Sequence, residues 1–422
     1  MTHSLQPARS GMRVSILLFL LPKLVRLLTL AACLSSIAEG ATVRRIPELT
    51  TLMYLVNRSD SINSFELHAP EISVIAPQVF TMDEQGFVEG EVPSPVLDIA
   101  RRHHVAVMPL VTNRHFNQPL MHTVLDSPVA RARAIRYLLY YALRDGYIGF
   151  QFDYENIHYT YRDKFTTFFQ EAARCFHRHG LLLSAAVVGK YSDEPDAPAP
   201  GGYENWSGVY DYRALGRSAD FLSVMAYPQH AGFSDPGPLA GVPWVRQIAD
   251  FSTGKLARRK VSLGIPLYGV EWDAVIPPLP TSVNQTQTSA SASAKKWNVH
   301  STAYSDILAR LPAESPSWDT DNQAHHFVLN RNGSLTEIWY EDADSLRPKL
   351  ELASRERFIG VSGWVLGRED PRLWSLLARE YRVRHPRCRL ITGSFDRRAR
   401  AAARRLEGSS YTLARRSKSR LS

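Results

Sequence analysis

Eight short β-prone runs that alternate with helical patterns limit most strongly what this chain can fold into. The runs are nearly continuously apolar, which is typical of strands buried on both faces of a parallel sheet. They are Leu52–Val56, Ile72–Val79, Val105–Thr112, Gly149–Tyr154, Leu181–Val188, Phe221–Tyr227, Val261–Tyr268 and Gly360–Leu366. Amphipathic stretches separate them, such as Ser94–His104, Val129–Arg144, Lys164–His179 and Val242–Ala257. Eight such units predict an α/β fold, a closed (β/α)8 TIM barrel. The alternative is an open doubly wound sheet, but no glycine fingerprint for a dinucleotide follows the first strand.

About ninety residues separate the last two predicted strands, which is more than one crossover helix needs. This segment contains the low-complexity stretch Thr281–Ala294, which predicts a loop. Residues 325–342 read as a β-hairpin that turns at Asn332-Gly333. We therefore expect a small α+β insertion, about 271–345, within a barrel domain of residues 41–390. A second long loop, Glu194–Gly208, is expected over the active face.

The formal charge of +9 belongs to the two ends of the chain. Residues from Arg397 onward carry +8 and residues 1–40 carry +3, which leaves −2 for the body between them. A nucleic-acid role for the folded body therefore has little electrostatic support. Residues 391–422 form a basic, Ser-rich tail that is expected to be disordered.

Residues 1–40 have the features of an export leader. Basic Arg9 and Arg13 precede an apolar run, and Ala38-Glu39-Gly40 has the small-residue spacing of a signal-peptidase site. Lys23 and Arg26 interrupt the apolar region, which argues against a continuous membrane span. The alternative is a lipobox, Leu30–Cys33, with Cys33 lipidated. We expect an exported protein that is secreted, periplasmic or associated with the cell envelope, with membrane contact only through a lipid on Cys33.

Only Cys175 and Cys388 lie beyond the leader. They imply no disulfide framework, and neither has the spacing of a metal ligand. No metal or cofactor is expected, and we expect a monomer.

The segment Gly149–Asn156, GFQFDYEN, carries the clearest chemical signal. Alternate residues of a strand share a face, so Gln151, Asp153 and Glu155 point to one side, about 6.6 Å apart at Cα. Carboxylates this close raise one another's pKa, which keeps one of them protonated near neutral pH. That is what a general acid for a glycosidic bond requires. The alternative is a strand end with solvated or salt-bridged acids.

Active sites of such barrels lie at the carboxyl ends of the strands. Gln78, Met225, Tyr227, Tyr268 and Trp364 all fall at predicted strand ends. Aromatic rings stack on sugars, and amides and carboxylates bond hydroxyl and amide groups. Each aromatic residue taken singly is more often part of the barrel core, but their shared position at strand ends favours a binding site.

Four ordered motifs fall at successive predicted strand ends. They are DYEN at 153–156, DFLSVMAYPQH at 220–230, KVSLGIPLYG at 260–269 and GVSGWVLGRED at 360–370. With these motifs the chain resembles, over roughly Thr51 to Trp374, glycoside hydrolase family 18, the chitinase-like barrels. The resemblance is closest to the branch of bacterial spore-cortex and peptidoglycan N-acetylglucosaminidases.

The resemblance implies a role for each motif residue. Glu155 would be the general acid and base, and Asp153 would orient the 2-acetamido group of the sugar. Tyr227 would bond the same acetamido, and Trp364 would form the floor of the subsite at the cleavage point. Met225, Gln78, Gln151 and Tyr268 are expected to contact substrate because of their positions on the predicted strands, and not because of the resemblance. The acetamido oxygen, not a protein carboxylate, would attack the anomeric carbon, so the reaction would retain configuration.

Two departures from the family pattern concern rate and subsite specificity. Ile148 and Gln151 stand where D-x-x-D-x-D-x-E has its first two acids, and the spore-type branch also carries an amide at the second of these positions. Pro228 replaces the acid of M-x-Y-D, which removes a carboxylate that would contact the sugar.

The expected partner is an N-acetylated polysaccharide or oligosaccharide, either chitin, peptidoglycan or an exopolysaccharide. A non-catalytic chitinase-like lectin is the alternative, and retention of Glu155, Asp153 and Tyr227 favours the enzyme. A scaffold or adhesion protein that uses the basic tail has little support in the sequence.

Overall fold

The computed structural model describes residues 48–195, 202–275, 297–311, 316–331 and 334–384. The predicted leader with Cys33, the stretch 281–294, the Asn332-Gly333 turn, Cys388 and the basic tail lie outside these residues. Among the residues that are described, no helix has both the length and the apolar character needed to cross a membrane.

Eight parallel strands close into a barrel, as the sequence predicts. Their order around the ring is β1-β15-β9-β8-β7-β6-β5-β2, and pairing of β1 with β2 closes it. The barrel strands are β1 (Glu48–Leu55), β2 (Val74–Met82), β5 (Leu110–Asn113), β6 (Gly149–Asp153), β7 (Leu182–Val188), β8 (Phe221–Met225), β9 (Val261–Pro266) and β15 (Gly360–Trp364). Short strands β3 (Val88–Gly90), β4 (Ala106–Val107) and β16 (Arg382–Val383) extend the sheet.

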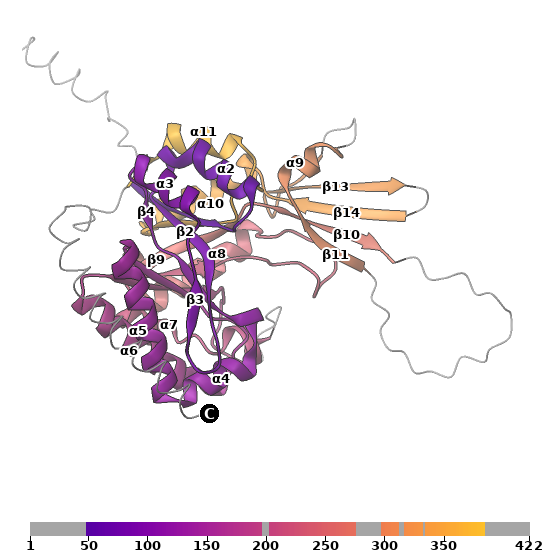
Figure 1. Ribbon diagram of the computed structural model, residues 1–422. Coiled ribbons are helices and arrows are strands. Elements are labelled where there is room, and N and C mark those ends of the chain that lie inside the picture. The colour runs from indigo at the N-terminus through magenta and orange to yellow at the C-terminus, as the bar shows by residue number, and fades with distance from the viewer. Residues whose placement is uncertain (1–47, 196–201, 276–296, 312–315, 332–333, 385–422) are drawn as a thin grey trace, which may run out of the picture. The chain divides into compact units, whose positions relative to one another are not determined.

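Helices surround the barrel (Figure 1). They are α2 (Ser59–His68), α3 (Ser94–Arg102), α4 (Gln118–Asp126), α5 (Pro128–Asp145), α6 (Arg162–Arg178), α7 (Tyr212–Ser218), α8 (Val242–Lys255), α10 (Ala343–Arg355) and α11 (Arg372–Glu380). Short turns of helix lie at η1 (Ala69–Glu71), η2 (Arg114–Phe116), η3 (Tyr159–Tyr161), η4 (Tyr203–Ser207) and η5 (Arg258–Lys260). Successive side chains of β6 point to opposite faces of the sheet. Phe150 and Phe152 pack outward in the main core against helices, while Gln151 and Asp153 share the inner face.

The predicted third strand, Val105–Thr112, is instead two strands, β4 and β5. β4 pairs with β2 alone, whereas β5 pairs with both β2 and β6. The register along β2 shifts between Gln78 and Phe80, so Val79 is an extra residue at a bulge. A bulge reverses the alternation of a strand. As a result Phe80 joins the outer core, although it lies an even number of residues after Gln78.

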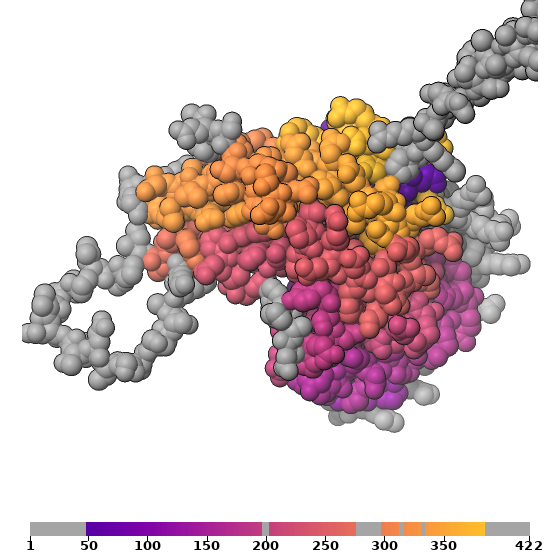
Figure 2. Space-filling model, turned by 180° about the vertical axis from the view of Figure 1, so that it is seen from behind, coloured from indigo at the N-terminus to yellow at the C-terminus, as the bar shows by residue number. Residues whose placement is uncertain are grey.

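A five-stranded antiparallel sheet is inserted between β9 and β15. Its order is β11-β10-β14-β13-β12. Its elements are β10 (Gly269–Ala274), β11 (Trp297–Thr302), α9 (Tyr304–Leu308), β12 (Ser317–Asp319), β13 (Ala324–Arg331) and β14 (Ser334–Tyr340). The predicted hairpin is confirmed, because β13 and β14 pair from His325↔Tyr340 to Arg331↔Ser334. The inserted strands project beside the barrel (Figure 1), and their surface adjoins that of the C-terminal segments (Figure 2).

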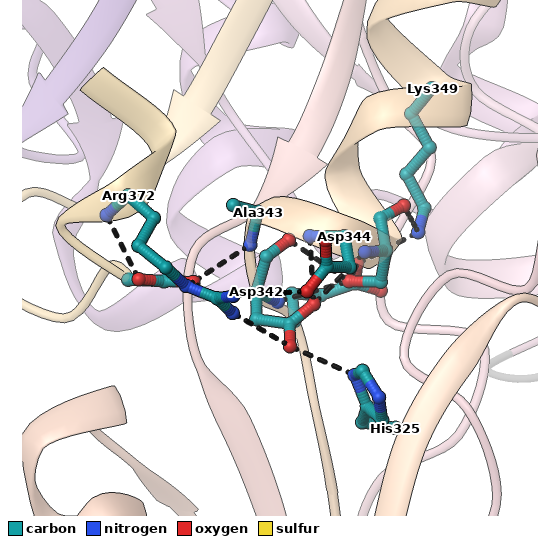
Figure 3. Close-up of polar contacts among 9 residues, drawn as sticks. His325, Asp342, Ala343, Asp344, Lys349 and Arg372 are labelled. Atoms are coloured by element: carbon teal, nitrogen blue, oxygen red, sulfur yellow. Dashed lines mark hydrogen bonds and ion pairs between the residues drawn. The ribbon is translucent and has the colours of Figure 1, made fainter. Parts of the chain in front are cut away.

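A polar cluster around Asp342 joins this sheet to the barrel (Figure 3). Oδ1 of Asp342 accepts hydrogen bonds from the backbone N–H groups of Asp344 and Ser345 and so caps α10. Its Oδ2 lies 2.8 Å from Nδ1 of His325 on β13 and 3.3 Å from Nη2 of Arg372 on α11. One buried carboxylate thus connects the insertion with two helices of the barrel.

Candidate active site

A cavity of about 600 Å³ lies at the carboxyl ends of the barrel strands. All but one of the eight residues predicted from the sequence line it. Those brought together are Gln78, Asp153, Glu155, Met225, Tyr227, Tyr268 and Trp364. The strand ends therefore converge as the barrel topology requires, and Gln151 is the exception.

Asp153 and Glu155 form the acidic centre of the cavity. Asp153 is 3% exposed, and burial raises its pKa to about 6, against hydrogen bonds from Gln78 and Glu155 that lower it. Burial, and then the Asp153 charge and a hydrogen bond to it, raise the pKa of Glu155 well above its usual value. The hydrogen bond between the two carboxyls lowers the pKa of Asp153 and raises the pKa of Glu155, which favours the proton on Glu155.

Gln78 reaches this centre from β2 at the bulge. Its Nε2 donates to Oδ2 of Asp153 over 3.2 Å. The alternation of β2 up to the bulge places Gln78 on the same inner face as Val74 and Ala76, which lie in the barrel interior. After the bulge the alternation of side chains is reversed, so Phe80 and Met82 belong to the outer core. Gln78 is thus placed to hold the charged form of Asp153.

Gln151 does not line the cavity, which corrects its predicted role in substrate contact. It is fully buried below Asp153, and protein atoms take both ends of its amide. The Tyr54 hydroxyl donates to Oε1 over 2.8 Å, and Nε2 donates to Ser184 Oγ at 2.8 Å and Ser223 Oγ at 3.0 Å. An amide satisfied on both sides has no free group for a sugar. Gln151 therefore supports the base of the site.

Tyr227 lies beyond the end of β8, over a glycine of β9. A Cβ atom added at Gly264 would stand 3.0 Å from Cε1 of Tyr227 and 2.5 Å from the carbonyl oxygen of Val224. Only glycine leaves room for this ring. Burial raises the pKa of Tyr227 well above 10, so its hydroxyl remains a hydrogen-bond donor at neutral pH.

Aromatic residues form most of the remaining wall. Trp364, at the end of β15, contacts Tyr54 of β1, with ring centroids 5.5 Å apart. The cavity is also lined by residues that sequence reasoning missed, Tyr54, Phe116, Trp206, Phe233 and Trp244 among them. Tyr54 is the residue before the last of β1 and was detectable by the same rule as Trp364. The others lie on loops or a helix, where no periodic pattern marks them.

Trp206 belongs to the predicted loop 194–208, whose described part reaches the cavity through η4. Arg162 donates to the carbonyl of Gly208 at 2.7 Å, and Gln118 Nε2 donates to Asn205 Oδ1 at 3.0 Å. Gln118 Nε2 also lies 3.3 Å from Oδ1 of Asn156, the residue after Glu155. Hydrogen bonds through Gln118 therefore connect the turn that carries Trp206 to the segment that follows Glu155.

The charge of the cavity is negative. Of the described residues that line it, two are carboxylic acids and none is lysine, arginine or histidine. Pro228, at the position of the missing family acid, also lines the wall. The cavity therefore favours a ligand with neutral groups over a ligand with anionic groups.

Glu271 and Asp273, the acids that follow the seventh barrel strand β9, lie on β10 of the inserted sheet. Glu271, Asp273 and His300 approach within 4.8 Å of one another, close enough to be considered as metal ligands. Nη1 of Arg310 contacts both Glu271 oxygens, at 2.7 and 2.6 Å, and so supplies the compensating charge. Neither acid lines the cavity, so neither is a second catalytic carboxylate for it.

Comparison with known proteins identifies the family. The model of glycosyl hydrolases family 18 matches residues 53–369. The chain is similar to an uncharacterized glycosylase YvbX of Bacillus subtilis, with 23% identity over 78% of this chain and 90% of the relative. It is also similar to the cortical fragment-lytic enzyme of the same organism, with 25% identity over 75% and 69% of the two chains.

Among solved structures, the spore cortex-lytic enzyme SleL of Bacillus megaterium superposes with a TM-score of 0.68. That match covers 81% of this chain and 76% of the other at 19% identity, and so concerns the fold. The barrel, the acid pair at its mouth and the family match agree. The chain belongs to glycosyl hydrolases family 18 and is a glycosidase.

Proposed function

We propose that the protein is a retaining, substrate-assisted glycosidase that cleaves glycans containing β-linked N-acetylglucosamine. Glu155 protonates the glycosidic oxygen while the 2-acetamido carbonyl oxygen attacks the anomeric carbon. The bond to the leaving sugar breaks, and an oxazolinium ion forms. The Glu155 carboxylate then takes a proton from water, which attacks the same carbon and restores the β configuration.

The observation that carries this proposal is that Asp153 and Glu155, two residues apart at the end of β6, are the two carboxylic acids among the described residues of the cavity wall. A two-carboxylate mechanism needs one acid to protonate and a separate one to attack, about 5 Å or more apart. The described lining contains no third carboxylate. The nucleophile is therefore assigned to the substrate.

The other side chains have supporting roles in this mechanism. Asp153, kept charged by Gln78, accepts from the acetamido N–H and offsets the positive charge of the oxazolinium. The protonated hydroxyl of Tyr227 donates to the acetamido. Trp364 stacks beneath the sugar at the cleavage point.

The charge of the cavity supports a neutral sugar at the reacting centre. N-acetylglucosamine is uncharged, whereas muramic acid carries a lactyl group whose free carboxylate, or the acidic peptide attached to it, would bring an anion near Asp153 and Glu155. In peptidoglycan the bond cut is thus expected to be the one on the reducing side of N-acetylglucosamine. The relation to a cortical fragment-lytic enzyme favours peptidoglycan fragments over chitin.

The test is to incubate the full chain with N-acetylated chitooligosaccharides, the same oligosaccharides after deacetylation, and peptidoglycan fragments, and to read the products by mass. N-acetylated substrates should be cut with the β-anomer released first, and a thiazoline mimic of the intermediate should inhibit. Cleavage of the deacetylated oligosaccharides at the same rate would refute substrate assistance. Binding of all substrates without products would favour the lectin alternative.

We also propose that the enzyme acts outside the cytoplasm. The basic and apolar leader and its small-residue site support export, and the Cys33 motif supports attachment to the envelope by a lipid. Mass analysis of the mature N-terminus distinguishes cleavage near Gly40 from lipidation of Cys33.

A further inference from the structure

The buried amide of Asn113 binds both backbone polar groups of Glu155. Oδ1 of Asn113 accepts from the Glu155 N–H at 3.0 Å, and Nδ2 donates to the Glu155 carbonyl at 2.9 Å. Asn113 ends β5, next to β6 in the barrel, and is 0% exposed. Two opposed hydrogen bonds fix the position and the rotation of the peptide units on either side of Glu155.

The two hydrogen bonds from Asn113 to the backbone of Glu155, called the Asn113 clamp below, lie just beyond the end of the sheet. The ladder between β5 and β6 ends at Thr112↔Asp153, so Glu155 lies beyond the last backbone pairing. Asn156, which follows, has φ of 54° and turns the chain away. Without the Asn113 amide, the backbone of Glu155 would be held by neither a strand nor a helix.

The neighbouring Asn117 shows that this use of the amide is specific. Both asparagines precede a helical segment, where Asn ordinarily caps the free N–H groups. Asn117 does so, since its Oδ1 accepts from the Leu120 N–H at 2.8 Å. Asn113 precedes η2 and makes no such cap. Its side chain binds the backbone of Glu155 instead, and its Nδ2 also donates a longer hydrogen bond, of 3.3 Å, to the carbonyl oxygen of Asn117.

We propose that Asn113 is a positioning residue that sets the geometry of Glu155 for proton transfer. This inference rests on the proposed role of Glu155 as general acid and base. The position of the Glu155 backbone determines where its carboxyl group lies relative to the glycosidic oxygen that it protonates. A displacement of this carboxyl group by about 1 Å would cost up to about 100-fold in rate. Asn113 itself does not line the cavity and so has no contact with substrate.

The first test compares Asn113→Ala with Asn117→Ala in the full chain. Both remove a buried or capping amide, but only the first frees Glu155. Asn113→Ala should lower kcat about 10- to 100-fold while KM for an N-acetylated oligosaccharide stays within about threefold. Asn117→Ala should lose thermal stability and keep kcat. An unchanged kcat in Asn113→Ala would overturn the proposal. So would a loss of kcat in Asn117→Ala as large as that in Asn113→Ala, if the two variants have the same melting temperature.

The variant Asn113→Asp gives a readout that a purely structural role would not move. A neutral carboxylic acid offers one donor and one acceptor, as the amide does, whereas its ionised form cannot donate to the Glu155 carbonyl. The ratio of its kcat to that of the wild type should therefore rise as the pH falls. A ratio independent of pH would contradict the Asn113 clamp.

Glu155→Gln, measured in parallel, distinguishes a failure of the proposed role of Glu155 from a failure of the proposed role of Asn113. If that variant stays active, the proposed acid is wrong. If it is inactive while both Asn113 variants behave as wild type, only the positioning role fails.

Discussion

Nε2 of Gln78 donates a hydrogen bond to Oδ2 of Asp153 across the mouth of the barrel, over 3.2 Å. The donor belongs to β2 and the acceptor to β6, which are separated in the ring by β5. A donor on Asp153 favours its charged form. This contact therefore helps to leave the proton on Glu155, where the proposed reaction needs it.

Replacing Gln78 by Ala should shift the pH profile of the enzyme. The pKa of Asp153, about 6 with the hydrogen bond present, should rise when the donor is lost. The acidic limb of kcat/KM should therefore move to higher pH, with the largest loss of activity below neutrality. Gln85→Ala, in an exposed turn, is the matched control and should leave the limb in place. An unmoved limb in Gln78→Ala would mean that Asp153 does not need this donor.

Glu155→Gln should abolish hydrolysis and preserve binding. The change keeps the shape of the side chain and removes the proton, and general acid–base groups contribute about 10² to 10⁴-fold in rate. Product formation and calorimetric binding of an N-acetylated oligosaccharide measure the two effects separately. More than a tenth of wild-type activity would show that another group donates the proton.

Asp153→Asn should stabilise the fold while it slows turnover. The pKa of Asp153 in the folded state, about 6, lies above its usual 3.8, so the folded protein binds more protons between these values. Its stability therefore falls as pH rises through this window. Asn cannot ionise, so the free energy of unfolding should gain roughly 1 to 3 kcal/mol above pH 6 and little below pH 3.8. Chemical denaturation at several pH values measures this, with the exposed Asp98→Asn as control.

Gly264→Ala should disturb Tyr227. The new Cβ atom would lie 2.5 Å from the carbonyl oxygen of Val224, which is backbone and cannot move cheaply, and 3.0 Å from the Tyr227 ring. We expect a loss of stability of about 1 to 3 kcal/mol and a lower kcat. Gly254→Ala, within α8, meets nothing within 4 Å and should be neutral or stabilising. Equal activity in the two variants would show that Tyr227 tolerates displacement.

Asp342→Ala should loosen the junction of the insertion with the barrel. It removes the cap of α10 and the partner of His325 and Arg372, at a cost of about 2 to 4 kcal/mol. Burial would raise the pKa of Asp342, but hydrogen bonds from His325 and Ser345 outweigh it and hold the pKa below 3.8. Its contribution should be complete above pH 3.8 and disappear as pH falls further. The control is Asp344→Ala, a half-exposed acid on the same helix, which should cost less.

The barrel and the acid pair were predictable because each depends on local periodicity. Continuous apolar runs mark buried parallel strands, and the period of two places Asp153 and Glu155 on one side of the chain. The same rule placed Tyr227 and Trp364 at the mouth. Gln151 obeys the rule as well, but alternation gives only the side of the strand and not the depth in the barrel. The structure puts it one layer below the cavity.

The remaining features depend on contacts between residues far apart in the chain. The bulge that ends the inward row of β2 at Gln78 arises from the register with β5, and no sequence pattern marks it. Asn113 looks in sequence like an ordinary helix cap, and only its proximity to Glu155 shows where the amide is used. The sequence alone thus determined the barrel and which acids reach its mouth. The tertiary structure decided which amides hold them, because hydrogen-bond partners are chosen by distance in space and not by spacing along the chain.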